Sequence, residues 1–317
     1  MVKYTLQRLL LMLMVTLIIT LICFVLIRML PPAELAPNDP HADIIAARRE
    51  ALGYNKPYLE QFWIFLKNVV LRWDWGVSDV LYSGRDVNQI FAEKIPATVY
   101  VNFISVIVSI PIGIVFGIIA ALKKNTWLDY TISTLTIVCI SVPAFVYAFL
   151  IQYFICFKLG WFPLLMSPGT DYFTWSMFVS VIPPVLSLSL PQIAGYTRTT
   201  RAELGEVLTG DYMLLARTKG LTKTQATVRH AMKNCMVIIV PSIFGSIVGT
   251  LYGGMITERI FAIPGVGSLS INAINARDYP LFLFSSCFYT VIGLASSIVV
   301  DISYGFIDPR IRMGSKK

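Results

Sequence analysis

Charged side chains are scarce in this sequence. Asp, Glu, Lys and Arg make up 14% of its 317 residues, whereas soluble globular domains carry about 25%. Apolar residues account for 56%, and the mean hydropathy is +0.69. Both departures predict an integral membrane protein rather than a soluble domain.

Histidine and cysteine are too few and too scattered to hold a metal. The two histidines, His41 and His230, are far apart in the chain. The five cysteines contain no Cys-x-x-Cys pair and all fall within or beside apolar stretches: Cys23, Cys139, Cys156, Cys235 and Cys287. Metal ligation needs clustered ligands, so we expect no metal site, and buried structural thiols are the simplest interpretation.

Motifs for nucleotide binding and catalysis are missing as well. There is no Gly-x-x-x-x-Gly-Lys-Ser/Thr sequence, and no Ser-His-Asp set or His-Glu-x-x-His helix is recognisable. The few candidate intramembrane charges lie near the ends of apolar stretches: Arg28, Glu258, Arg259 and Asp301. We therefore expect no catalytic residue and no cofactor bound by this chain, and a proton-driven transporter acting alone is poorly supported.

Six continuous apolar stretches are long enough to cross a membrane as helices. A hydrocarbon core of about 30 Å takes about 20 helical residues, whereas β-strands would alternate apolar and polar positions. The first stretch is longer than the apolar part of a signal peptide and lacks a clean cleavage site, so an uncleaved span is favoured. An all-α integral membrane protein is expected, with spans near Leu9–Arg28, Thr98–Leu122, Tyr130–Phe157, Phe173–Thr197, Val237–Thr257 and Leu281–Tyr304.

Basic residues predict the orientation. Lys3 and Arg8 precede the first span, and the segment Arg198–Lys233, called the basic segment below, carries seven Lys and Arg against three acids. By the positive-inside rule, both termini and the basic segment lie in the cytoplasm. The net charge of +8 is then a topology signal in a multi-pass protein of the inner (cytoplasmic) membrane, and no nucleic-acid partner is expected.

Prolines interrupt the third and fourth spans. They are Pro143, Pro183, Pro184 and Pro191. Each proline removes a backbone hydrogen-bond donor and kinks its helix, and the kink is either a hinge for transport or a static feature. Glycines repeat at every fourth position in the second and fifth spans: Gly113 and Gly117, and Gly245, Gly249 and Gly253. They either allow close packing of helices or line a substrate path, and close packing is favoured.

The segment between the first two spans, Met29–Ala97, is the only sizeable extracytoplasmic piece expected. Ile44–Leu52 and Tyr58–Trp73 show apolar residues at helical spacing. Three aromatic side chains either lie at the membrane interface or pack a small cap against the spans, and the cap is favoured: Trp63, Trp73 and Trp75.

The basic segment itself predicts two short helices. Tyr212–Lys219 forms the first, Gly220 ends it, and Thr222 or Thr224 begins the second. Such a pair would form a rigid knob able to move the attached spans. The alternative is an amphipathic loop lying on anionic lipid, and the motif described next favours the knob.

The basic segment resembles the EAA loop of ABC-importer permeases, in the variant found in dipeptide, oligopeptide and nickel permeases. The matching residues are Asp211-Tyr212, Thr218-Lys219-Gly220-Leu221 and Arg229-His230-Ala231-Met232-Lys233-Asn234. Ala216 and Gly220 also fit the general EAA signature, whereas Leu214 and Leu215 stand where Glu and Ala are expected.

Further matches follow in order along most of the chain. They include Thr257–Gly267, similar to the family's Glu-x-x-Phe-x-x-Pro-Gly-x-Gly loop, and Arg49–Pro57, Ser141–Phe145, Lys158–Pro163 and Asp308–Arg312. The most similar type is the B-type permease subunit of dipeptide and oligopeptide importers. Leu30-Pro31-Pro32 departs from the family, which usually has Gly-Asp-Pro at this place.

The resemblance implies a type I ABC importer fold and one half of a pore for peptides. Its partners would be a homologous C-type permease, two ABC ATPase subunits that bind ATP and Mg, and an extracytoplasmic peptide-binding protein. The implied ATPase-coupling residues are Asp211, Tyr212, Ala216, Arg217, Gly220 and Leu221. The implied outer gate, which meets the binding protein, holds Glu258, Phe261, Pro264, Gly265 and Gly267.

Three parts of the chain are expected from this resemblance. Residues 1–97 hold the first span and the extracytoplasmic segment, residues 98–309 form the transporter domain with a coupling loop at about 198–236, and residues 310–317 form a cytoplasmic tail. Three alternatives stay open: the same importer class carrying nickel or a metal–chelator complex, a secondary transporter or channel acting alone, and a non-transporting receptor or scaffold.

Overall fold

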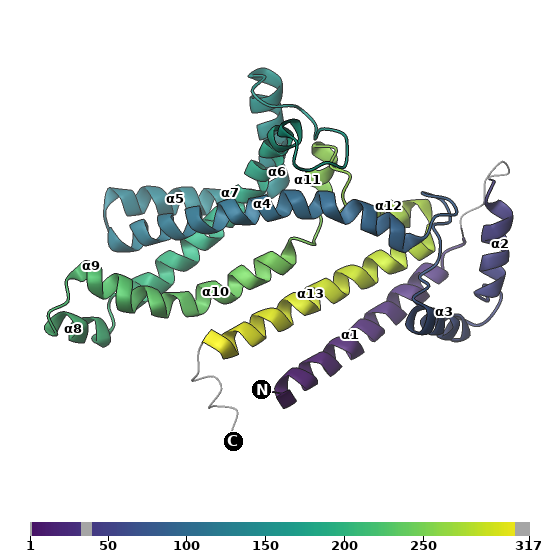
Figure 1. Cartoon of the computed structure of the whole chain (residues 1–317), viewed down its shortest axis with the longest axis horizontal. Coiled ribbons are helices and arrows are strands. Elements are labelled where there is room, and N and C mark those ends of the chain that lie inside the picture. The colour runs from purple at the N-terminus through teal and green to yellow at the C-terminus, as the bar shows by residue number, and fades with distance from the viewer. Residues whose placement is uncertain (1, 33–39, 308–317) are drawn as a thin grey trace.

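The computed structural model describes residues 2–32 and 40–307, and the regular structure of these residues is helical (Figure 1). Asp308–Arg312 and the tail 310–317 lie outside the described residues. Among the described residues, five helices are long and apolar enough to cross a membrane. They are α1 (Val2–Arg28), α4 (Val87–Leu122), α7 (Trp175–Val207), α10 (Met232–Gly249) with the turns before it, and α13 (Tyr279–Ile307).

The third expected span is broken. α5 (Trp127–Ser141) and α6 (Ala144–Ile151), which continues as the π-helical turns Gln152–Lys158, meet at an angle of 97°, so six crossings are obtained if this pair counts as one. The break falls at Val142, which is extended because a proline follows it. The Tyr147 hydroxyl donates a hydrogen bond back to the Val138 carbonyl at 3.3 Å, which ties α6 to the end of α5.

The other expected interruptions do not break their helix. Pro183, Pro184 and Pro191 all lie inside α7, which is continuous. The sequence places the end of this span at Thr197, but the helix runs on to Val207 because its last turns bury Thr200 and Leu204 against neighbouring helices. The expected loop at about 198–236 is therefore largely helical.

The fifth span also differs from its expected bounds. It is preceded without a break by α9 (Lys223–Ala226) and the π-helical turns Thr227–Ala231, so the helix begins well before Val237. It ends at Gly249, and the short helix α11 (Met255–Ile260) follows as a separate element.

α4 and α7 pack closely through the glycines of the second span. A Cβ atom at Gly113 would lie 2.5 Å from the Tyr196 Cβ, and one at Gly117 would collide with Thr200. The close-packing interpretation is confirmed here. In the fifth span it holds in part: Gly245 faces Val300, but no atom of another element lies within 4 Å of a Cβ built at Gly249.

The ends of the helices define two ends of the molecule. The start of α1, the end of α13, α8 (Asp211–Thr218) and α9 lie toward one end. Toward the other lie α2 (Ala42–Ala51), α3 (Tyr58–Arg72) and α12 (Leu269–Ala276) (Figure 1). The start of α1, the end of α13 and the turn between α8 and α9 thus lie on the same side of the molecule, as the distribution of basic residues predicts.

The segment before α4 is held against the ends of α1 and α13. Buried side chains of all three elements form one cluster: Phe24, Ile27, Phe62, Phe65, Val69, Tyr279 and Leu283. Asp278 also binds this segment, because its carboxylate accepts hydrogen bonds from the Ser78 hydroxyl and from the backbone amides of residues 79–81. Trp75 packs on Phe65 and Phe284, as the cap interpretation predicts, whereas Trp63 and Trp73 are exposed.

Candidate functional site

The first candidate site is α8 with the turn that ends it. Gly220 has φ +87°, a left-handed conformation that glycine adopts without strain. The Leu221 amide donates to the Ala216 carbonyl and the Gly220 amide to the Arg217 carbonyl, which together form a Schellman motif. The expected helix and its stop at Gly220 are thus found, one residue earlier than Tyr212–Lys219 at each end.

The next helix begins as the sequence predicts. The Thr222 hydroxyl accepts a hydrogen bond from the Gln225 amide at 3.3 Å, and the Gln225 side chain accepts one from the Thr222 amide at 3.0 Å. This reciprocal pair is a capping box, which fixes where α9 starts. The chain therefore turns between α8 and α9 in a defined conformation rather than as a flexible loop.

α8 is attached to the membrane helices through its buried face. Met213 and Ala216 are buried, and Leu221 packs beside them. The other buried members of the same cluster come from α4, α7 and the continuous helix α9–α10: Ala121, Leu204, Ala226, Ala231, Cys235 and Ile239. Because interior side chains are closely packed, this cluster fixes the position of α8 relative to those helices.

The opposite face of α8 is open. Asp211, Arg217 and Gly220 are exposed there, and Tyr212 belongs to the same helix. Leu214 and Leu215 are 65% and 56% exposed, and Val228 beyond the turn is also exposed. Sequence reasoning treated the two leucines as departures from the EAA signature, yet they are the large apolar side chains that this helix presents outward. Leu214 and Leu215 stand between Met213 and Ala216 in the sequence, and this helical spacing could have indicated that they point away from the buried face.

An ion pair between a buried carboxylate and a partly exposed guanidinium joins α5 to α7 near the same end of the molecule. The Arg201 guanidinium donates to both carboxylate oxygens of Asp129, at 2.6 and 3.0 Å. Asp129 also accepts a hydrogen bond from the Asn125 amide at 2.9 Å. A groove of about 520 Å³ lies between α8 and the nearby ends of α4 and α7, and it is lined in part by Lys124, Asp211 and Arg217. The sequence did not indicate the pair.

The second candidate site is the segment Glu258–Gly267, called the Pro-Gly loop below. Its centre is the buried side chain of Glu258, which occupies space left by three glycines. A Cβ atom at Gly253, Gly265 or Gly267 would lie 2.5 to 2.8 Å from atoms of the Glu258 carboxyl group. The Pro-Gly-x-Gly pattern therefore has a physical reason, because side chains at these positions would displace the carboxylate.

Hydrogen bonds hold the Glu258 carboxylate in this socket. One oxygen accepts from the Thr98 hydroxyl and the other from the Gly267 amide, both at 2.8 Å. The Thr98 hydroxyl in turn accepts from the Val266 amide at 2.9 Å. Burial raises the pKa of Glu258, and the hydrogen bonds from Thr98 and Gly267 oppose that effect.

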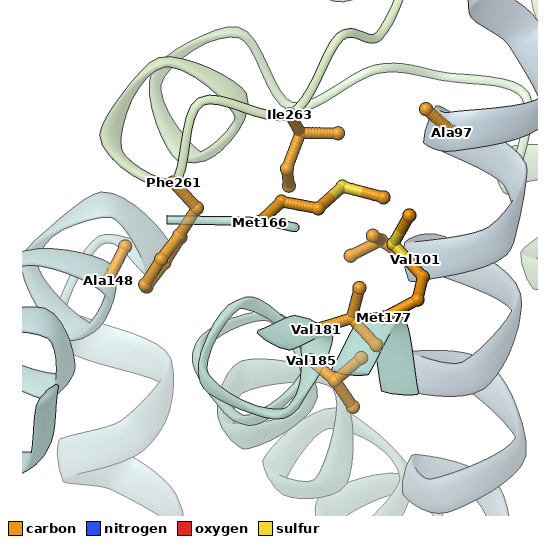
Figure 2. Close-up of a cluster of buried hydrophobic side chains, with 9 residues drawn as sticks. All are labelled: Ala97, Val101, Ala148, Met166, Met177, Val181, Val185, Phe261 and Ile263. Carbon is orange, nitrogen blue, oxygen red and sulfur yellow. The ribbon is translucent and has the colours of Figure 1, made fainter. Parts of the chain in front are cut away.

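The loop is also fixed by apolar packing, as Figure 2 shows. Phe261 is fully buried, and Ile263 and Met166 lie beside it in a cluster with residues of α4, α6 and α7: Ala97, Val101, Ala148, Met177, Val181 and Val185. The Gln152 side chain donates a hydrogen bond to the Ile260 carbonyl at 2.6 Å. Pro264 is exposed at the turn, so it is the member of the expected set that faces outward.

The structure brings each set of expected residues together but keeps the two sets apart. One set lies at the α8 end and the other at the α11 end of the transmembrane helices (Figure 1). Within residues 2–32 and 40–307, no group of three His, Cys, Asp or Glu is placed to hold a metal. The first set is a helix and its terminal turn, and the second is a packed loop around a buried carboxylate.

Comparison with known proteins identifies the family. The family described as "Binding-protein-dependent transport system inner membrane component" matches residues 113–313, and the corresponding N-terminal family matches residues 1–101. The dipeptide transport system permease protein DppB of Bacillus subtilis is 30% identical over 318 residues, covering 100% of both chains. The glutathione transport system permease protein GsiC of Salmonella typhimurium is 33% identical, covering 98% of this chain and 99% of that one.

A solved structure shares the fold. The MetNI methionine ABC transporter, in inward-facing conformations, matches with a TM-score of 0.51 at 13% identity over 68% of this chain and 97% of that one. The two family matches, which cover most of the sequence, and the long apolar helices place the protein in the inner membrane as a multi-pass component. The chain belongs to the family of inner membrane permease components of binding-protein-dependent ABC transport systems.

Proposed function

We propose that the chain forms one half of the membrane pathway of an ATP-driven importer for short peptides. The observation that carries the proposal is the construction of α8, whose buried side chains belong to one cluster with residues of α4, α7 and the α9–α10 helix, while Leu214 and Leu215 are exposed. The relatives named for dipeptide and glutathione transport favour peptides as the cargo.

Two partner ATPase subunits supply the energy, and one of them binds the exposed face of α8. Leu214 and Leu215 provide the apolar contact, with Arg217 beside them. ATP and Mg bind within the partners. Closure of the ATPases pulls α8, and the packed residues Met213 and Ala216 pass the displacement to α4, α7 and α10.

The opposite end receives the cargo. An extracytoplasmic binding protein delivers the peptide to the side that holds the Pro-Gly loop, and a second, homologous permease completes the pore. The Glu258 socket keeps this loop in one conformation against α4 through Thr98. On this proposal both termini and α8 face the cytoplasm, as the basic residues predict.

Uptake by the complete system tests the cargo and the energy source together. The chain, its second permease, both ATPases and the binding protein are reconstituted in proteoliposomes, and uptake of labelled di- to hexapeptides, glutathione and a nickel chelate is compared. ATP-dependent uptake of peptides is expected. Uptake of the nickel chelate alone would reassign the cargo, and ion-gradient-driven uptake by this chain alone would contradict the importer proposal.

Substitution of the exposed leucines tests the ATPase contact. The double variant Leu214→Asp, Leu215→Asp should keep the protein folded, because neither side chain is buried, but should abolish copurification of the ATPase subunits and ATP-driven uptake. Thr218→Ala is the matched control, since the Thr218 side chain is exposed and its hydroxyl donates to the Leu215 carbonyl of its own helix. Normal copurification by the double variant would show that the ATPase binds elsewhere.

A further inference from the structure

α3 carries a second apolar face besides the one packed on the protein. Phe62, Phe65 and Val69 point into the cluster with α1 and α13. Leu59, Trp63 and Val70 are 72%, 65% and 69% exposed. Their spacing of four and seven residues places them in one stripe along the helix. An isolated exposed leucine needs no explanation, but an aligned stripe with a tryptophan does.

The position of α3 along α1 fixes its depth in the membrane. Its buried face packs on Phe24 and Ile27, with Leu21 also at the cluster, so α3 lies beside the last turns of α1. The 27 residues of α1 extend about 40 Å, and the hydrocarbon core is about 30 Å thick. The last turns of α1 therefore lie at the edge of the hydrocarbon, and so does α3.

The residues around the stripe suit that boundary. Glu60 and Lys67 lie on the helix face beyond the stripe, and Arg72 is at the end of α3; all three are exposed. Trp73, directly after the helix, is exposed as well. Tryptophan is enriched at membrane interfaces, and long basic side chains place their charges among the lipid head groups while their stems stay in apolar surroundings.

The end of α1 also presents exposed apolar side chains. Leu26 is 60% exposed in the last turn of α1, and Met29, directly after this helix, is 64% exposed. The stripe on α3 lies at the same depth as these side chains, since both helices share the Phe24 and Ile27 cluster. A membrane span presents exposed apolar side chains to lipid, so the shared depth favours lipid over a protein partner as the occupant.

We propose that α3 is an interfacial helix, lying in the boundary between hydrocarbon and head groups of the leaflet in which α1 ends. Leu59, Trp63 and Val70 contact the acyl chains there. Because α3 also packs on Tyr279 and Leu283, this contact sets the depth at which α13 enters the membrane. The transport cargo plays no part in the proposal.

Spin labels distinguish lipid, water and protein as the surroundings of the stripe. The complete transport complex, with a nitroxide at Leu59→Cys or Val70→Cys, is placed in phosphatidylcholine–phosphatidylglycerol vesicles. The matched controls are Glu60→Cys and Lys67→Cys. The stripe labels should be relaxed several-fold more by oxygen than by chromium oxalate, and the control labels should show the reverse.

Each other result would overturn the proposal. Equal access of chromium oxalate to both sets would show a solvated helix, and protection of the stripe from both reagents would show a protein partner on it. Trp63→Phe gives a second measurement without added cysteines. Brominated phosphatidylcholine should quench a smaller fraction of the tryptophan emission in this variant than in the wild type, and an unchanged fraction would place Trp63 away from lipid.

Discussion

The Thr98 hydroxyl donates a hydrogen bond of 2.8 Å to the carboxylate of Glu258 and at the same time accepts one from the Val266 amide. One side chain of α4 thus binds both ends of the Pro-Gly loop. All the groups involved are buried, so the loss of this hydroxyl cannot be compensated by solvent.

Thr98→Val should destabilise the protein by about 1–3 kcal/mol, because the variant has the same shape but leaves two buried polar groups without a partner. Thermal unfolding in detergent measures the loss. Thr98→Ser is the matched control, since it keeps the hydroxyl and should lie close to the wild type. Equal melting temperatures for Thr98→Val and the wild type would mean that the hydrogen bonds contribute nothing.

Gly265→Ala should destabilise the loop more than an average surface substitution. The added methyl group would lie 2.5 Å from the Glu258 carboxyl carbon and would also collide with Thr98, so the carboxylate must leave its socket. We expect a loss of about 2–3 kcal/mol, measured by thermal unfolding, together with reduced uptake in the complete system. Gly249→Ala is the control: a Cβ there meets no other element, and the melting temperature should not fall.

The stability of the protein should depend on pH through Glu258. Its pKa is raised by burial, so the native state binds this proton more tightly than the unfolded chain does. Above the raised native-state pKa the buried carboxylate is ionised, and its ionisation lowers the free energy of unfolding. As the pH falls through this pKa toward the value of about 4.3 in the unfolded chain, Glu258 is protonated in the native state and that stability is regained. Glu258→Gln lacks the titration. The melting temperature of the wild type minus that of Glu258→Gln should rise from pH 8 to pH 5, and a falling difference would contradict the assignment.

Arg201→Gln should be strongly destabilising, by about 2–4 kcal/mol, because it leaves the Asp129 carboxylate buried without its cation. Arg201→Lys should lose less, since it keeps the charge but not the two parallel hydrogen bonds. The exposed pair Lys56–Glu60 offers a comparison within the same chain, and Lys56→Gln should change stability by less than about 0.5 kcal/mol. Similar losses for Arg201→Gln and Lys56→Gln would show that the Asp129 site is accessible to water.

Local features of the fold could be predicted from the sequence. The stop at Gly220 follows from the left-handed conformation that glycine tolerates, and the start at Thr222 follows from a cap that involves only nearby residues. The close approach of α4 at Gly113 and Gly117 follows from the absence of side chains there. Each of these depends on chemistry within a few residues.

Features that depend on distant partners could not be predicted. Thr98 and Glu258 are 160 positions apart, and Arg201 and Asp129 are 72 apart, so no spacing rule brings either pair together. The presence of a proline was also insufficient to predict where a helix breaks. Pro143 ends a helix, whereas Pro183 and Pro184 sit buried within a continuous one, and the difference lies in the packing around each.

The helix that begins at the Thr222 cap runs without a break to Gly249, and the 26 residues from Thr224 extend about 40 Å. Soon after it ends, Gly253 packs directly on Gly267 and on the Glu258 carboxylate. One continuous helix thus connects the α8 turn to the residues that lead into the Glu258 socket. In the proposed importer, a tilt of this helix at the α8 turn would therefore shift the chain beside the socket.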